Sequence, residues 1–573
     1  MHFVEILERR NVMRRLFVCL VIVLLLSGCA DLARLLPEEA TAEPPNIYTA
    51  PTPRPFPAEV STAARILERG EMIVGVRYDL EPFSYVGSDG QLAGLEIDLA
   101  HALAQRWLGD AQAVRFRQVR SDTALQHLQS GDVDFVLAGI VHTQEAETDA
   151  DFSPPYFMNG QALLTFPDTG VTSLADIDGL SVGGLSWAEG MVQLQAASPV
   201  TPTYVPYDDF AQLVSGLRTR EIDAFAGLRH RLERARRSVA GTQIVAQYTQ
   251  LPLALVYREN DPFFGDLVAT TFREMATDGT WETLYAQWLS GATPPEIPDW
   301  PGTRPIPALN ESPQERATLN TLEQIRQRGT VRAGYFPERW PYSADRGDGV
   351  QTGFEVRLLE LMAERWLGDR QAITYVPVTE ETAFQQLQSG EVDLLLGGWL
   401  HTEEAEQQVA FSLTLLDDGV SLLSPQSAPV ETPEGLAGRP VGVIAGTAAE
   451  AALPRITEAT GVGLNPVTYP DRDAAVAALQ SGEVAALLAE RRLLFDPFYR
   501  VGGFFLPDAR LTYRPIGYVL PRGDSDFRDF VNLTLATLHA DGSFAELYRI
   551  WFDDAIPELR PWPGRPLISL SLR

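Results

Sequence analysis

The chain reads LQSGDVD at residues 128–134 and LQSGEVD at residues 387–393, an offset of 259 residues. The same offset relates RWLGD at residues 106–110 to RWLGD at residues 365–369, and it holds without a gap from Gly70 and Gly329 onward. A repeat this long indicates a duplicated domain, because the units of solenoid proteins run only about 20–50 residues. Each copy therefore provides an independent check on the interpretation of the other.

Within each copy, short apolar runs alternate with amphipathic ones. In the first copy, residues 72–76 and 133–138 have the composition of buried strands, and residues 95–107 have the pattern of an amphipathic helix. A second set of the same kind begins at residues 180–184. Strands that alternate with helices indicate βαβ units and parallel sheets. The predicted fold class is therefore α/β, with two tandem modules that each contain two doubly wound lobes.

The composition excludes several classes of function. The net charge of −30 argues against nucleic acid as a partner, because binding to phosphates requires basic patches. The chain has no lysine, which excludes a Schiff base and the lysine of a phosphate-binding loop. Sequence motifs for a nucleophile elbow, a Cys–His pair or a cofactor are absent from the sequence. We therefore expect no enzyme activity and no cofactor.

The N-terminal segment has the features of a lipoprotein signal. Four arginines precede the apolar run of residues 16–26, which is followed by Ser27, Gly28 and Cys29. We predict that residues 1–28 are a signal peptide, that Cys29 is lipidated, and that translation starts at Met1 or Met13. This places the protein on the extracytoplasmic face of the cell membrane. The alternative is an ordinary signal or anchor in which the cysteine is incidental.

Two proline-rich stretches suggest the domain boundaries. Proline at high density disfavours helices and sheets, so we predict a tether at residues 29–58 and a linker at residues 306–313. The two modules are then expected at residues 59–305 and 314–570.

A series of motifs occurs in the same order in both copies. Pro82-Phe83 matches Pro341-Tyr342, GLEID at residues 94–98 matches GFEVR at residues 353–357, and DGTW at residues 278–281 matches DGSF at residues 541–544. With the LQSG runs, these motifs resemble family 3 of the bacterial extracellular solute-binding proteins, the receptors of polar amino-acid ABC transporters. The resemblance implies two α/β lobes joined by two crossing strands, near residues 162–166 and 253–257 in the first copy, with the ligand held between the lobes.

The resemblance also implies which residues contact the ligand. Family members that bind amino acids have a run GITxTxER, whose arginine pairs with the ligand carboxylate. This chain reads GIVHTQEA at residues 139–146 and GWLHTEEA at residues 398–405, so Ala146 and Ala405 replace that arginine. Because alanine cannot replace a guanidinium, we expect neither copy to bind an ordinary α-amino acid tightly. Arg77 could restore an anion site in the first copy, or it could be a solvent-facing loop residue.

The other candidates have several expected roles. Aromatic side chains could form flat apolar surfaces, Gly446 and Thr447 could form an anion-binding turn, and Glu490 stands where the family often binds an ammonium group. His142 and Glu145, like His401 and Glu404, have a spacing compatible with a metal, but Thr143 and Thr402 are better read as helix N-caps. We expect no metal. The candidate ligand-binding residues are Arg77, Phe83, Gly139, His142, Trp187, Tyr342, Gly398, His401, Gly446, Thr447 and Glu490.

Together these features predict a lipid-anchored receptor that captures a small polar solute and delivers it to an ABC permease. Two alternatives remain open at this point. The first is a sensor or interaction protein with degenerate clefts, and the second is a dehydratase-like enzyme on the same scaffold.

Overall fold

A computed structural model describes residues 60–186, 188, 190–289, 292–295, 309, 319–347, 349–496 and 502–552. The predicted lipidation site Cys29, the tether, Trp187 and all of the linker except residue 309 lie outside these residues. Within the described residues, no helix has both the length and the apolar character needed to cross a membrane. We refer to residues 60–295 as module 1 and to residues 319–552 as module 2.

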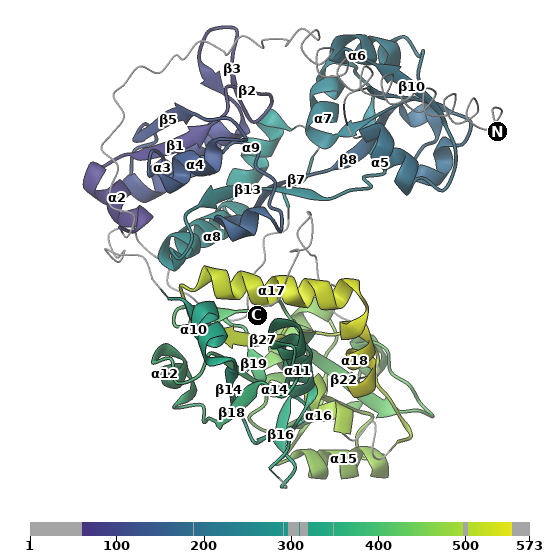
Figure 1. Ribbon diagram of the computed structural model, residues 1–573. Helices are drawn as coiled ribbons and strands as arrows, with labels where there is room; N and C mark the ends of the chain where they lie inside the picture. The colour runs from purple at the N-terminus through teal and green to yellow at the C-terminus, as the bar shows by residue number, and fades with distance from the viewer. Residues whose placement is uncertain are drawn as a thin grey trace, which may run out of the picture. The chain divides into compact units, whose positions relative to one another are not determined.

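The first lobe of module 1 is built on a five-stranded sheet with the order β5-β1-β6-β13-β7 (Figure 1). Strand β1 pairs in parallel with its two neighbours, whereas β13 pairs in antiparallel fashion. The strands are β1 (Met72–Val76), β5 (Val114–Gln118), β6 (Phe135–Leu137), β7 (Asp151–Asn159) and β13 (Leu251–Tyr257). The predicted strand at residues 72–76 is confirmed, and the predicted helix corresponds to α3 (Leu95–Leu108). The other helices of this lobe are α2 (Thr62–Arg69), α4 (Ala124–Gln129), α8 (Pro262–Thr277) and α9 (Thr280–Trp288).

The second lobe of module 1 has its own five-stranded sheet, with the order β10-β9-β11-β8-β12. Parallel pairs join β9 to β10 and β11, while β8 and β12 run antiparallel. The strands are β8 (Gln161–Thr165), β9 (Ser181–Leu185), β10 (Thr203–Tyr207), β11 (Ala224–Leu228) and β12 (Gln243–Val245). Helices α5 (Gly190–Ala197), α6 (Phe210–Arg218) and α7 (Arg229–Ser238) complete the lobe.

The connections between these two lobes differ from the prediction. Residues 162–166 and 253–257 were expected to cross between the lobes, but β8 pairs only within the second sheet and β13 only within the first. The crossings are instead at Gly160 and at the segment before β13. Gly160 has a φ of 145°, and a Cβ there would lie 2.0 Å from the carbonyl oxygen of Thr249 on the other connection. The two crossings are therefore in close contact, which only glycine permits here.

Module 2 repeats this architecture. Its first sheet has the order β18-β14-β19-β27-β20, with β21 also paired to β27, and its second sheet has the order β24-β23-β25-β22-β26. The strands of the first sheet are β14 (Val331–Tyr335), β18 (Ile373–Pro377), β19 (Leu394–Leu400), β20 (Ala410–Phe411), β21 (Leu416–Asp417) and β27 (Pro515–Leu520). Those of the second are β22 (Val420–Pro425), β23 (Pro440–Ile444), β24 (Asn465–Tyr469), β25 (Ala486–Glu490) and β26 (Phe504–Phe505). The helices are α10 (Thr321–Arg328), α11 (Phe354–Leu367), α12 (Ala383–Gln388), α13 (Glu403–Glu406), α14 (Ala448–Thr460), α15 (Arg472–Ser481), α16 (Arg491–Asp496), α17 (Ser525–Ala540) and α18 (Ser543–Phe552).

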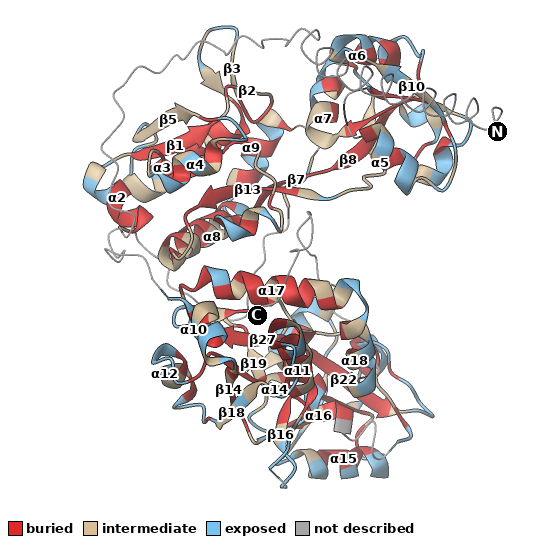
Figure 2. Cartoon of the chain, in the orientation of Figure 1, coloured by how far each residue is buried: buried red, intermediate tan, exposed pale blue. Residues whose placement is uncertain are grey.

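Each lobe has hydrophobic side chains buried between its sheet and its helices, and the central strands are buried along most of their length (Figure 2). Trp281 of module 1 and Trp366 of module 2 are among the largest fully buried side chains. Each donates its indole N–H within its own lobe, to the carbonyl of Phe272 and to the hydroxyl of Thr534 respectively, so the polar atom of each ring is paired.

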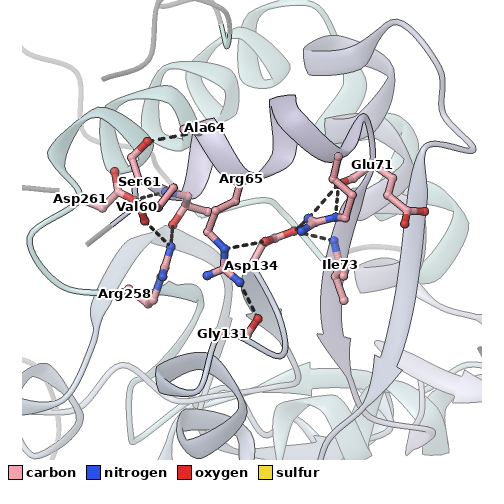
Figure 3. Close-up of polar contacts among 12 residues, drawn as sticks. Val60, Ser61, Ala64, Arg65, Glu71, Ile73, Gly131, Asp134, Arg258 and Asp261 are labelled. Carbon is pink, nitrogen blue, oxygen red and sulfur yellow. Dashed lines mark hydrogen bonds and ion pairs between the residues drawn. The ribbon is translucent and has the colours of Figure 1, made fainter. Parts of the chain in front are cut away.

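The repeated LQSG(D/E)VD motif ends in a carboxylate that stabilises the first lobe. Asp134 is fully buried, and it accepts a hydrogen bond from the backbone N–H of Ile73 on β1 at 2.7 Å (Figure 3). It also pairs with Arg69, and the Nε of Arg65 lies 3.9 Å from it. In module 2, Asp393 accepts from the N–H of Arg332 at 2.7 Å and pairs with Arg328. The most similar stretch of the two copies therefore serves the fold.

Candidate functional site

The candidate site is a cavity of about 530 Å³ in module 2. Its lining comes from the loop around Tyr342, the end of β19 at Gly398 and Trp399, and the connections that join the lobes at Asp418 and Arg514. A volume of this size is typical of sites for small molecules. The location at the ends of strands and between the lobes also matches the expectation for open α/β sheets.

One wall of the cavity is aromatic. Tyr342, Phe384 and Trp399 line it, and the rings of Phe384 and Trp399 lie 5.1 Å apart between centroids. Gly398 allows Tyr342 to approach this closely, because a Cβ at residue 398 would lie 2.1 Å from Cδ2 of the tyrosine ring, and Gly398 has a φ of 73°. A flat apolar group of a ligand could pack against this wall.

A buried carboxylate holds the Gly398 turn in place. Glu355, at the start of α11, accepts hydrogen bonds from the N–H groups of Gly397 at 2.5 Å and Gly398 at 2.9 Å. Burial raises the pKa of the Glu355 carboxyl to about 7, and the two N–H donors oppose this rise. In module 1, Glu96 accepts in the same way from the N–H of Gly139 at 2.7 Å. These acids belong to the GLEID and GFEVR motifs, so the motif acid shapes the turn that borders the site.

Three arginines also line the cavity, and two of them are paired with acids. Arg339 pairs with Glu380 and stacks over the ring of Phe336 at 3.5 Å. The Nε of Arg492 lies 3.2 Å from Oδ2 of Asp418. Both of these positive charges are therefore balanced within the protein.

Asp418 occupies the connection between β21 and β22. It is 2 % exposed, and Oδ1 accepts the backbone N–H of Arg492 at 2.7 Å. Burial raises the pKa of its carboxyl to about 7; the guanidinium of Arg492 lowers it, and the carboxylate of Glu490 adds to the rise.

Arg514 is the third arginine, and it lies just before β27. Its backbone N–H donates to Asp417 at 2.8 Å, and its carbonyl accepts from the N–H of Asp418 at 2.9 Å. Its side chain lines the cavity, and among the described residues its guanidinium forms no ion pair and its Nε has no hydrogen-bond partner. The indole N–H of Trp399 also lacks a partner in this part of the chain. With the hydroxyl of Tyr342, which also has no partner among the described residues, three donors of the lining remain available to a ligand.

The structure brings together only some of the predicted site residues of module 2. Tyr342 and Gly398 line the cavity, whereas His401, Gly446, Thr447 and Glu490 are not part of its lining. The N–H of Gly446 donates to Glu450 and that of Ala448 to Glu490. The predicted anion-binding turn at the start of α14 is therefore already occupied by carboxylates of the chain itself.

The two predicted histidines have structural surroundings in both modules. His401 stacks on Phe411 with ring centroids 4.1 Å apart, and its Nε2 lies 2.6 Å from a carboxylate oxygen of Glu406. His142 stacks on Phe152 at 4.2 Å and contacts Glu147. Each histidine thus contacts the acid five residues after it, Glu147 or Glu406. Burial lowers the pKa of both imidazoles. No group of three or more metal-ligating side chains occurs in the described part of the chain.

Two other predicted residues of module 1 are engaged within the protein. The Nε and one terminal nitrogen of Arg77 donate to the carboxylate of Asp79, at 2.8 and 3.0 Å, and the other terminal nitrogen donates to Ser121. Its charge is thus balanced by a neighbouring acid. Phe83 is fully buried and packs edge-on against Phe157 with centroids 5.1 Å apart, so it forms part of the hydrophobic core.

The sequence interpretation did not identify Arg339, Asp418, Arg492 and Arg514. Equivalent hydrogen bonds in the two modules identify the module-1 counterparts of three of them. His401 donates its N–H to the carbonyl of Pro515 and His142 to that of Pro252, which makes Leu251 the counterpart of Arg514. The N–H of Arg492 bonds to Asp418 and that of His230 to Asn159, which pairs these residues as well. The two modules thus differ in charge at the same places.

Comparison with known proteins identifies the repeat. The profile described as "Bacterial extracellular solute-binding proteins, family 3" matches residues 72–291 and, a second time, residues 331–554. A glutamine-binding protein of Geobacillus stearothermophilus is 32% identical over 171 residues, which cover 29% of this chain and 64% of that protein. The ABC transporter glutamine-binding protein of Bacillus subtilis is 24% identical over 40% of this chain and 84% of its own length.

Solved structures also match about one module each. An ancestral cationic amino acid solute-binding protein is 28% identical, with a TM-score of 0.36, over 40% of this chain and 99% of its own chain.

Proposed function

Since the chain belongs to family 3 of the bacterial extracellular solute-binding proteins and carries its module twice, we propose that it is a lipid-anchored receptor that presents a small polar solute to an ABC-type importer. In this proposal the protein binds its solute without transforming it. The relatives named as parts of ABC transporters support the transport role, and the LSGC run at residues 26–29 supports the anchor.

The observation that carries the proposal is the module-2 cavity between the lobes. It combines an aromatic wall with polar groups from the two connections at Asp418 and Arg514. Closure of the lobes about these connections would enclose a ligand and bring both sets of groups onto it. Because Asp418 and Glu380 are each paired with an arginine, we assign them to binding and positioning rather than to catalysis.

A thermal-shift screen of the full chain tests the binding role. Amino acids, polyamines, organic acids and sugars would be added singly, because a solute that binds the native state raises its melting temperature. At a concentration 100 times its dissociation constant, a solute adds about 2.7 kcal/mol to the free energy of unfolding. The proposal expects at least one class to give a saturable shift. Absence of a shift across all classes, with the protein folded, would contradict it.

The anchor requires a separate test. Cys29→Ser should move the protein from the membrane fraction to the soluble fraction, and mass spectrometry of the wild-type N-terminus should show an acylated cysteine. Cys19→Ser, within the predicted signal peptide, is the matched control. Membrane association that survives Cys29→Ser would refute the lipid anchor while leaving the solute-binding role intact.

A further inference from the structure

We propose that the ligand of the module-2 cavity is an organic acid with a planar apolar body, whose carboxylate binds Arg514 and Trp399 while its body packs against the aromatic wall. This inference rests on the proposed receptor function and specifies its ligand class. It also assigns the role of carboxylate anchor to a residue on the connection between the lobes.

The charges of the cavity lead to this assignment. Six charged side chains line it, and four of them form two pairs: Arg339 with Glu380, and Arg492 with Asp418. Glu338 and Glu380 are both exposed to solvent, so water screens the charges of these two acids. Arg514 forms no ion pair among the described residues, and the one buried acid whose carboxyl pKa it lowers, Asp418, is already paired with Arg492. An anionic group is therefore the favoured partner.

The hydrogen-bond donors agree with the charge. The Nε of Arg514 and the Nε1 of Trp399 are both shielded from solvent, and neither has an acceptor among the described residues. A buried donor without an acceptor is unfavourable, so a ligand that supplies an acceptor gains affinity. A carboxylate fits well, because its two oxygens match the fork formed by Nε and a terminal nitrogen of a guanidinium.

The aromatic wall determines the rest of the ligand. The ring of Trp399 lies 5.1 Å from that of Phe384 and 5.2 Å from that of Phe336, so its orientation is fixed by packing on two sides. Tyr342 is only 3 % exposed and holds its place through the Gly398 turn. A rigid apolar surface of this kind favours a planar group over a flexible polar chain.

Module 1 offers a built-in comparison. The counterpart of Arg514 is Leu251, and the counterpart of Trp399 at the offset of 259 is Ile140. Neither side chain carries a donor, so module 1 should not contribute to binding of such an acid. Titration of the full chain should therefore give about one site per chain.

The test is isothermal titration of the full chain with 3-phenylpropanoate, phenethylamine, L-phenylalanine and succinate. We expect 3-phenylpropanoate to bind, phenethylamine not to bind because it lacks an anion, and succinate to bind more weakly because it lacks a ring. L-Phenylalanine should bind more weakly than 3-phenylpropanoate, because its ammonium group has no unpaired buried acid to meet. Equal or tighter binding of phenethylamine would overturn the inference.

Variants locate the binding. Arg514→Ala should weaken binding of 3-phenylpropanoate by about 10- to 100-fold, the usual range for loss of a charged hydrogen bond. Arg514→Lys keeps the charge but loses the two parallel N–H donors, so its affinity for 3-phenylpropanoate should lie between those of the wild type and Arg514→Ala. Trp399→Phe keeps an aromatic ring but loses the indole donor, and it should weaken binding less than Arg514→Ala does. Arg439→Ala removes an exposed arginine of the same module that is not part of the lining, and it should leave the affinity unchanged.

The outcomes separate this inference from the receptor function. If Arg514→Ala does not fold, Arg514→Lys and Trp399→Phe still decide the case, and unchanged affinity in both would refute the proposed anchor. A neutral or cationic solute whose binding does not depend on Arg514 would refute the ligand class but support the receptor. A full chain that is folded and binds none of the screened solutes would refute the receptor function itself.

Discussion

Substitution of Gly398 by alanine tests how the aromatic wall is built. A new Cβ would lie 2.1 Å from Cδ2 of Tyr342, far inside van der Waals contact, and it would sit on a backbone with a φ of 73°. The left-handed backbone costs about 1–2 kcal/mol for a residue with a Cβ. Tyr342 must also move out of a site where it is 3 % exposed. Complete loss of the packing of a buried aromatic side chain costs about 3–5 kcal/mol. We therefore expect Gly398→Ala to lower the free energy of unfolding by at least about 3 kcal/mol.

Gly482→Ala is the matched control for this experiment. Gly482 lies at the C-terminus of α15 with a φ of 77°, and no atom would lie within 4 Å of its Cβ. It should therefore show only the backbone cost of about 1–2 kcal/mol. The assay is urea unfolding of the full chain, followed through the transition of module 2, which contains both residues, together with titration of 3-phenylpropanoate. Equal destabilisation by the two substitutions would show that the close contact between Gly398 and Tyr342 is not essential.

Three other predictions concern charge and specificity. Because Asp418 has a pKa of about 7 in the folded protein and an ordinary value of 3.8, the native state binds more protons between these values and its stability falls as the pH rises through them. Asp418→Asn should remove up to about 4 kcal/mol of this change in stability between pH 4 and pH 8. Asp473→Asn, at an exposed acid, is the control and should leave the change in stability in place. Asp134→Ala should destabilise module 1 by about 3–5 kcal/mol, because it leaves buried Arg65 without its acid, and chemical denaturation measures this. The wild-type chain should bind no ordinary α-amino acid at micromolar concentrations in calorimetric titration. Ala405→Arg puts a guanidinium into the cavity lining and should create measurable binding. Tight binding of an amino acid by the wild-type chain would refute this prediction.

The sequence predicted the parts of the fold that depend on local pattern. The duplication, the strand at residues 72–76 and the helix that begins at Leu95 follow from repeated motifs and from hydrophobic periodicity. The crossings between the lobes were placed too far along the chain, because an apolar run does not reveal which of two sheets it joins. Only the pairing of β8 and β13 with their neighbours decides this.

The site was harder to predict because it is assembled from distant segments. Tyr342, Gly398 and Arg514 lie far apart in the chain, and only the tertiary fold brings them to one cavity. The N-cap predicted at Thr402 is confirmed at the start of α13. The neighbouring imidazole of His401 contacts Glu406 and stacks on Phe411, which local spacing does not reveal. The histidine of the repeated motif thus stabilises the fold, whereas an arginine on the connection between the lobes, Arg514, lines the cavity.

The carboxylates Glu96 and Glu355 are identical in the two copies, as are Asp134 and Asp393, while the cavity position Arg514 corresponds to Leu251. After a gene duplication, substitutions at the shared acids would be removed by selection for folding in either half. Substitutions along the connections leave each hydrophobic core intact, so they are open to selection for a new solute. Fusion in one polypeptide also keeps the two modules at equal copy number. One module can therefore change the solute that it binds while the other keeps the older solute.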